Sequence, residues 1–115
     1  MNKLILACFD KPDWVHRLLR SLLEKKLQFI AGLKGARFDL IETGGGAASS
    51  TVISPDLHRE FCLPYDRALH DALHDLGFLV AYHTCGGTRG IEQLIVENGC
   101  DVSETLAPRS IGSNQ

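Results

Sequence analysis

A strand that ends in a glycine turn is the feature of this sequence that most constrains its fold. The apolar run 77–81, GFLVA, leads directly into residues 82–87, YHTCGG. The apolar run predicts a buried strand, and the two glycines predict a turn after it. Alternate residues of a strand point to one face, so His83 and Cys85 project together at the carboxyl end. An imidazole beside a thiolate predicts a site for zinc or another thiophilic metal.

The first third of the chain predicts a helix followed by a short strand. Asp10 is expected to cap a helix that has Pro12 in its first turn and continues to about Leu33. Gly35 is expected to stop it, and His16 is expected to be a surface or packing residue. The short run 38–42 then reads as a buried strand that ends in a loop.

The rest of the chain continues the alternation. Ser54 and Pro55 predict a second helix start, and Pro64 is expected to kink that helix or to break it into two short helices. His70 and His74, one turn apart, are expected on a solvated helix face. Further elements are expected at 78–83 (strand), 88–98 (helix) and 101–106 (strand). Helices and strands alternate, which predicts an α/β fold with about three parallel strands.

Composition narrows the class of protein. The chain has 115 residues, 44% hydrophobic and 23% charged, which is typical of one globular domain. A net charge of −2 gives no basis for nucleic-acid binding, and no segment approaches the length of a membrane span. The four cysteines form no close pair, and the apolar run 4–9 is too short for a signal peptide. We therefore expect a cytoplasmic protein with reduced thiols.

Four motifs in order resemble the uroporphyrinogen decarboxylase superfamily. Residues 54–65, SPDLHREFCLPY, resemble its segment with serine-proline, phenylalanine and proline-tyrosine. Residues 12–16 resemble its helix entry, 77–86 resemble its strand with histidine, cysteine and glycine, and 91–101 are similar to the helix and turn that follow. The resemblance runs from about residue 4 to residue 108, so residues 1–115 are treated as one domain.

The resemblance implies a (βα)₈ barrel with its site at the carboxyl ends of the strands. Such a barrel takes roughly 250 residues or more, so this chain is expected to form a partial barrel, the middle-to-late section. Open strand edges and an uncovered inner face would then favour a homo-oligomer, and one alternative is a non-catalytic module that only assembles.

The resemblance also implies two activities. In the methyltransferase branch, zinc held by a histidine-cysteine pair activates a thiol for methyl transfer to or from a corrinoid (cobalamin) carried by a partner protein. His83 and Cys85 match that pair, and Glu42 is a candidate further ligand. Candidate residues for binding a small-molecule substrate follow the preceding strand: Thr43, Gly44, Gly45 and Gly46. Cys100 is a poor ligand because a helix carries the chain to the other end of the sheet. The alternative is a decarboxylase of porphyrin biosynthesis, which needs no metal or cofactor.

Overall fold

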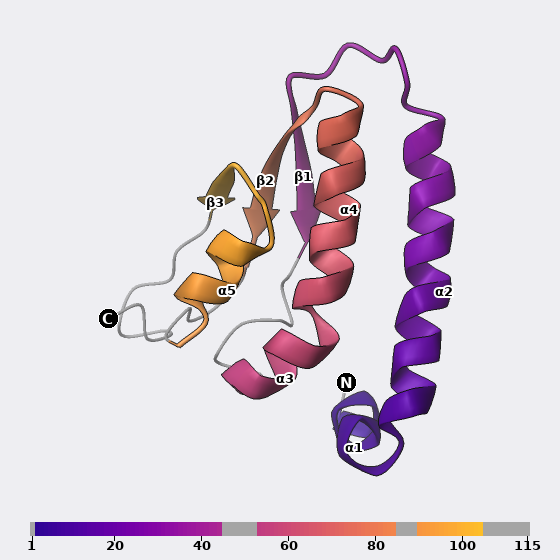
Figure 1. The fold of residues 1–115 in the computed structure, drawn as a ribbon, viewed down its shortest axis with the longest axis vertical. Helices are drawn as coiled ribbons and strands as arrows, with labels where there is room; N and C mark the ends of the chain where they lie inside the picture. Colours follow the sequence, from indigo (N-terminus) through magenta and orange to yellow (C-terminus); the bar gives the residue numbers. More distant parts are fainter. Residues whose placement is uncertain (1, 45–52, 85–89, 105–115) are drawn as a thin grey trace.

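The fold is a mixed α/β arrangement built on one small sheet. A computed structural model describes residues 2–44, 53–84 and 90–104. Its elements, in order, are α1 (Asn2–Asp10), α2 (Pro12–Ala31), β1 (Leu40–Gly44), α3 (Pro55–Phe61), α4 (Leu63–Asp75), β2 (Leu79–His83), α5 (Glu92–Glu97) and β3 (Val102–Glu104). The three strands are parallel in the order β1-β2-β3, which confirms the predicted α/β class (Figure 1). Within the described residues the sheet is open, and a closed barrel is not formed there.

The start of α3 and the break before α4 have local causes. The hydroxyl of Ser54 accepts a hydrogen bond from the Leu57 backbone N–H at 3.3 Å, so it caps α3 as predicted. Pro64 has no backbone N–H and cannot continue the preceding helix. The chain therefore turns at Cys62, and α4 begins at Leu63 with Pro64 in its first turn. The prediction of two short helices is confirmed.

The amino-terminal helices differ from the prediction. Asp10 does not cap a helix; it is the last residue of α1, an additional helix formed by the apolar run. Lys11 precedes α2 and makes no capping hydrogen bond with its side chain, while Pro12 begins the helix as predicted. The helix then ends at Ala31, slightly before the expected Leu33, and Gly35 adopts a φ of 83° in the turn that follows.

All of the helix packing in the described part of the chain falls on one face of the sheet. This helix face carries Ile41 and Thr43 of β1 with Val80 and Tyr82 of β2. Val80 packs with Ile30, Leu73 and Phe78, and Tyr82 packs with three apolar residues of the α5 region, Ile91, Leu94 and Ile95. Figure 1 shows α4 beside the sheet and α2 running alongside α4. The core of the molecule is thus the layer between this face and its helices.

The opposite face of the sheet is the open face. Its residues are Leu40, Glu42, Gly44, Leu79, Ala81, His83 and Val102, placed together by strand alternation and by the register of the parallel pairs. Leu40, Leu79 and Val102 are 50%, 54% and 50% exposed. Only Ala81, the small residue of the central strand, is buried. The open face is therefore apolar and largely uncovered.

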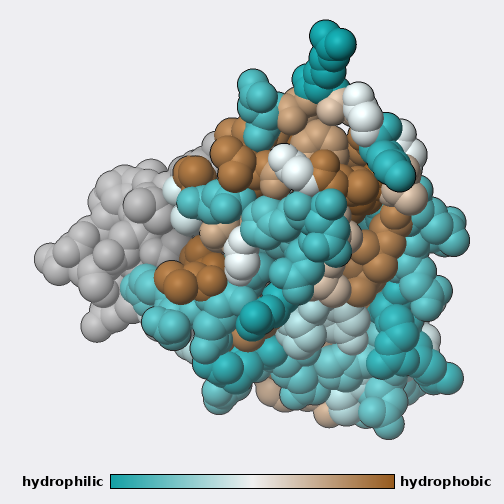
Figure 2. Space-filling model, turned by 45° about the horizontal axis from the view of Figure 1, so that its top comes forward, coloured by the Kyte–Doolittle hydropathy of each residue, from teal (hydrophilic) through white to brown (hydrophobic). Residues whose placement is uncertain are grey.

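The surface elsewhere also carries apolar side chains. Figure 2 shows hydrophobic residues in broad areas between hydrophilic ones on the side that it presents. Phe29 and Phe38, at the end of α2 and before β1, are among the most exposed, at 72% and 57%. Even so, none of the helices in the described ranges is both long and apolar enough to cross a bilayer.

Candidate functional site

The carboxyl ends of β1 and β2 bring two of the candidate ligands to one face. Gly44 is the register partner of His83, and Glu42 is the partner of Ala81. Glu42 and His83 therefore lie on the open face in adjacent rows of neighbouring strands. Val102 and Glu104 of β3 are the partners of Ala81 and His83, so β3 continues the same two rows. This is the edge at which parallel α/β proteins bind ligands.

The other members of the predicted ligand and substrate set fall in different places. Cys85, Gly45 and Gly46 lie outside the described residues. Among the residues that are described, no group of three metal-ligating side chains comes together. Gly44 ends β1 and forms part of the wall of a cavity on the helix side.

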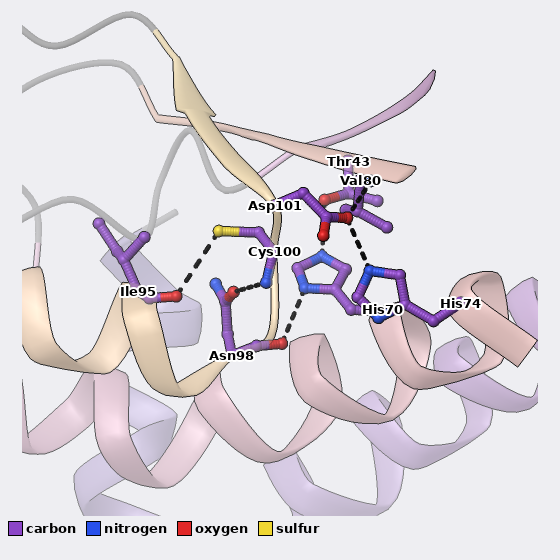
Figure 3. Close-up of polar contacts among 8 residues, drawn as sticks. All are labelled: Thr43, His70, His74, Val80, Ile95, Asn98, Cys100 and Asp101. Atoms are coloured by element: carbon purple, nitrogen blue, oxygen red, sulfur yellow. Dashed lines mark hydrogen bonds and ion pairs between the residues drawn. The ribbon is translucent and has the colours of Figure 1, made fainter. Parts of the chain in front are cut away.

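Thr43 lies on the helix face, away from Glu42 and His83. Its hydroxyl is 2.7 Å from Nε2 of His70 in α4. The other ring nitrogen of His70, Nδ1, is 2.9 Å from the backbone carbonyl of Asn98. The carbonyl can only accept, so Nδ1 donates to it. Burial favours the neutral imidazole, in which Nε2 accepts from the Thr43 hydroxyl. His70 thus ties β1, α4 and the end of α5 together (Figure 3).

The prediction that His70 and His74 share a solvated face is wrong for His70. His70 is fully buried, and its ring meets that of Tyr82 edge-on at a centroid distance of 5.6 Å. Burial lowers its pKa, an effect partly offset by the hydrogen bonds of Asn98. Spacing along the helix placed the two histidines on one side, but it did not reveal that the sheet covers His70.

His74 belongs to a partly exposed cluster at the amino end of the sheet. Its Nε2 donates to Oδ2 of Asp101 at 2.7 Å, and the Val80 backbone N–H donates to the same oxygen at 2.7 Å. The Asp101 N–H in turn donates to the Val80 carbonyl at 2.8 Å. The hydrogen bond from His74, followed by that from Val80, holds the pKa of Asp101 below its usual value. Figure 3 shows His70 and His74 pointing from one helix toward these different partners.

Cys100 is part of the same region and not of the carboxyl edge. It lies just before β3, and its thiol donates to the Ile95 carbonyl at 3.6 Å (Figure 3). Its backbone N–H donates to the Asn98 side chain at 2.9 Å. His83 is paired with the far end of β3. The geometry therefore agrees with the expectation that Cys100 is a poor partner for His83.

Tyr82 and Asp66 form a second polar pair, between the sheet and the helices, which the sequence did not indicate. The Tyr82 hydroxyl donates to Oδ2 of Asp66 at 2.7 Å. Burial raises the pKa of Asp66 to about 6, against the opposing effects of the Tyr82 hydrogen bond and the charge of Lys26. Burial likewise raises the pKa of the neighbouring Cys62 thiol to about 12, so this cysteine is inert at neutral pH.

His16 is a packing residue at the junction of α2 with α3 and α4. Its ring stacks on Phe61 at a centroid distance of 4.6 Å. Nε2 is 3.0 Å from a carboxylate oxygen of Glu60, and Nδ1 bonds with the Tyr65 hydroxyl. These contacts give His16 the packing role that was one of its two expected fates.

His58 of α3 differs from His70, the other buried histidine, because neither of its ring nitrogens has a hydrogen-bond partner among the described residues. Its side chain is fully buried, and burial lowers its pKa. Sequence spacing gave no signal for this residue.

Comparison with known families gives one match. Residues 1–105 match the family model described as Uroporphyrinogen decarboxylase (URO-D). Neither the curated proteins nor the solved structures include a significant match to this chain. The matched span contains all of the helices and strands described above.

Proposed function

Because the chain belongs to the uroporphyrinogen decarboxylase family, we propose that it supplies ligands to a zinc site of that family's methyltransferase branch. The reaction would move a methyl group to or from a corrinoid through a metal-bound thiol. The observation that carries the proposal is the placement of Glu42 and His83 on the open face at the carboxyl ends of adjacent strands.

The donor chemistry of these residues fits zinc. His83 offers an imidazole nitrogen, Glu42 a carboxylate and Cys85 a sulfur, all of which zinc accepts. Cys85 follows His83 by two residues, the spacing that returns a strand side chain to the same face. His83 and Cys85 would hold the metal, with Glu42 as an additional ligand. When bound, the zinc would lower the pKa of a thiol substrate.

Apolar residues surround His83 on the open face, and they would exclude water from the site once another chain covered that face. Leu79 and Ala81 lie on the same face of β2, and Val102 lies beside Ala81 on β3. These apolar side chains would form the floor beneath the ligands. A low local dielectric strengthens the interaction of an imidazole or a carboxylate with a cation.

The test is the zinc content of the protein after purification without a chelator. We expect about one zinc per chain in the wild type and less than ~0.2 in His83→Ala and in Cys85→Ser. Cys100→Ser is the matched control, because this cysteine lies at the other end of the sheet, and it should leave zinc unchanged. Wild-type protein without zinc, or equal loss in the control, would rule out the proposal.

The runner-up is a decarboxylase that acts on a tetrapyrrole, and its support is the family match itself. The two activities differ in their need for metal. The test is to add a porphyrin to zinc-free wild type and to zinc-free His83→Ala. An equal shift of the porphyrin absorption spectrum in both proteins would favour the decarboxylase.

We also propose that the chain associates with a second copy of itself. This association does not require that the chain catalyse a reaction. The open face carries Leu40, Leu79 and Val102 half exposed, and β1 and β3 each leave one edge unpaired among the described strands. Uncovered apolar area and open strand edges both favour pairing between chains. A stable monomer in light scattering would rule this association out.

A further inference from the structure

A cavity of about 270 Å³ lies on the helix side of the sheet. Side chains of α1, α2, α3 and α4 line it, together with Gly44 and Tyr82. Its wall is mainly apolar; the residues that matter here are Ile5, Val15, Leu19, Leu23, Phe61 and Leu69. Tyr82 faces the opposite side of the sheet from His83. The cavity is therefore separate from the proposed metal site.

One carboxylate interrupts the apolar wall. Asp66 lines the cavity and accepts a hydrogen bond from Tyr82 through Oδ2. The described residues provide no hydrogen bond to its other oxygen and no ion pair to the group. Lys26 also lines the cavity, but it is exposed, and its charge acts on Asp66 only from a distance.

An unpaired carboxylate in such a place needs an explanation. A buried tyrosine hydroxyl requires an acceptor, which a neutral amide would supply as well. The carboxylate adds a desolvated negative charge, which is costly unless a cation offsets it. Since no described side chain supplies that cation at contact distance, a ligand that carries one would complement the site.

We propose that this cavity binds a small apolar amine, with its ammonium group on Asp66 and its hydrocarbon part among the α2 and α4 side chains. The size fits such a molecule. An apolar cavity of ~150 Å³ holds benzene, so 270 Å³ accommodates an aromatic ring with a short chain. One charged group at the end of an apolar pocket is the usual arrangement by which proteins orient small ligands.

Isothermal titration of the full chain with 2-phenylethylamine tests the proposal. The neutral isostere 2-phenylethanol and the anion 3-phenylpropanoate serve as matched ligands. We expect saturable binding of the amine, tighter than the alcohol by about tenfold or more, and no binding of the anion. Asp66→Asn keeps an acceptor for Tyr82 and should remove the preference for the amine over the alcohol.

Two further measurements locate the ligand. Leu19→Phe should fill the cavity and weaken both the amine and the alcohol, whereas Asp66→Asn should weaken only the amine. Thermal melting of each variant verifies that it is folded. Absence of saturable amine binding, or an amine preference that survives Asp66→Asn in folded protein, would overturn the proposal.

The pH dependence of binding provides an independent check. The titratable groups around the carboxyl of Asp66 are Tyr82 from β2, Lys26 from α2, Cys8 from α1, Cys62 and Tyr65 at the start of α4, and Cys100 before β3. The pKa values of the three thiols and both phenols are raised, so these groups stay neutral between pH 5 and 7.5. Asp66 has a pKa of about 6, so amine affinity should fall about tenfold between pH 7.5 and 5.0. An affinity that does not change over this range would contradict the role given to Asp66.

Discussion

The two faces of the sheet differ in almost every physical respect. On the helix face, Val80 and Tyr82 are fully buried, and the polar groups of Thr43 and His70 bond to each other. On the open face, Leu40 and Leu79 leave about half of their surface in water. The same two strands supply both faces, so the contrast arises from what covers them and not from strand composition.

This contrast separates a packed face of the sheet from an uncovered one. Buried apolar side chains such as Val80 and Leu73 make the helix face the core of the molecule. The candidate ligands Glu42 and His83 lie on the uncovered face instead. If the sheet belonged to a barrel of the kind expected for the family, the open face would be its interior, because the helices of such a barrel lie outside. The three predictions below test the contrast, beginning with the largest effect.

The first prediction compares one leucine from each side. Leu73→Ala removes a side chain that is 1% exposed in the helix-face core and should cost about 2–5 kcal/mol of unfolding free energy. Leu79→Ala removes one that is 54% exposed and should cost less than about 1 kcal/mol in dilute protein. Urea denaturation measures both. If a second copy covers the open face, the cost of Leu79→Ala grows with protein concentration; equal costs for the two leucines would contradict the contrast.

The second prediction compares two fully buried histidines under the helices. His70→Phe breaks the hydrogen bonds to Thr43 and to the Asn98 carbonyl, and should cost about 2–3 kcal/mol. His58→Phe removes two ring nitrogens that find no hydrogen-bond partner in the described part of the chain, and should be neutral or stabilising within about 1 kcal/mol.

The pH dependence of the same pair has a definite sign. Burial lowers the pKa of both histidines, so the folded state resists protonation. Their contribution to stability is present above the ordinary value of 6.5 and is lost as the pH falls below it. His58→Phe should flatten this loss between pH 7 and pH 5. Thermal melting across that range measures it, and a steeper loss in the variant would show the assignment to be wrong.

The third prediction concerns the charge of Asp66. Its pKa of about 6 lies above the ordinary 3.8, so the folded state holds the proton more tightly. The stability contributed by this group is present below pH 3.8 and is lost as the pH rises through 6. Asp66→Asn should therefore stabilise the ligand-free protein by about 1–2 kcal/mol at pH 7 and leave it unchanged at pH 4. Equal stability of the two proteins at pH 7 in urea would refute this.

Local sequence signals predicted the elements whose causes are local. The cap at Ser54, the break at Pro64 and the turn at Gly35 each depend on a few neighbouring residues. The strand at 79–83 was recognisable because it is short, apolar and bounded by glycines. The prediction that Asp10 caps the following helix was wrong because the apolar run before it forms a helix of its own, in which Asp10 is the last residue. The preference of aspartate for capping positions does not reveal such a preceding helix.

The polar groups under the helices could not be predicted because their partners are distant in sequence. Asp66 and Tyr82 are 16 residues apart, and Thr43 and His70 are 27 apart. Nothing in the local pattern around His70 distinguishes a buried histidine from a solvated one. The candidate metal ligands were accessible to sequence reasoning for the opposite reason: His83 and Cys85 are only two residues apart in the sequence. Their role as ligands stays a prediction.

The contacts of Asp101 have a consequence for the far end of the sheet. Its carboxylate and its own N–H hold Val80 at the start of β2, just where β3 begins. Within the described residues, β3 contributes three register pairs, too few to fix its alignment firmly by themselves. Sliding β3 by one residue would place Ser103 instead of Glu104 opposite His83 and would turn Val102 to the other face of the sheet. From the amino end of the sheet, Asp101 thus helps to determine which residue of β3 lies opposite the imidazole of His83.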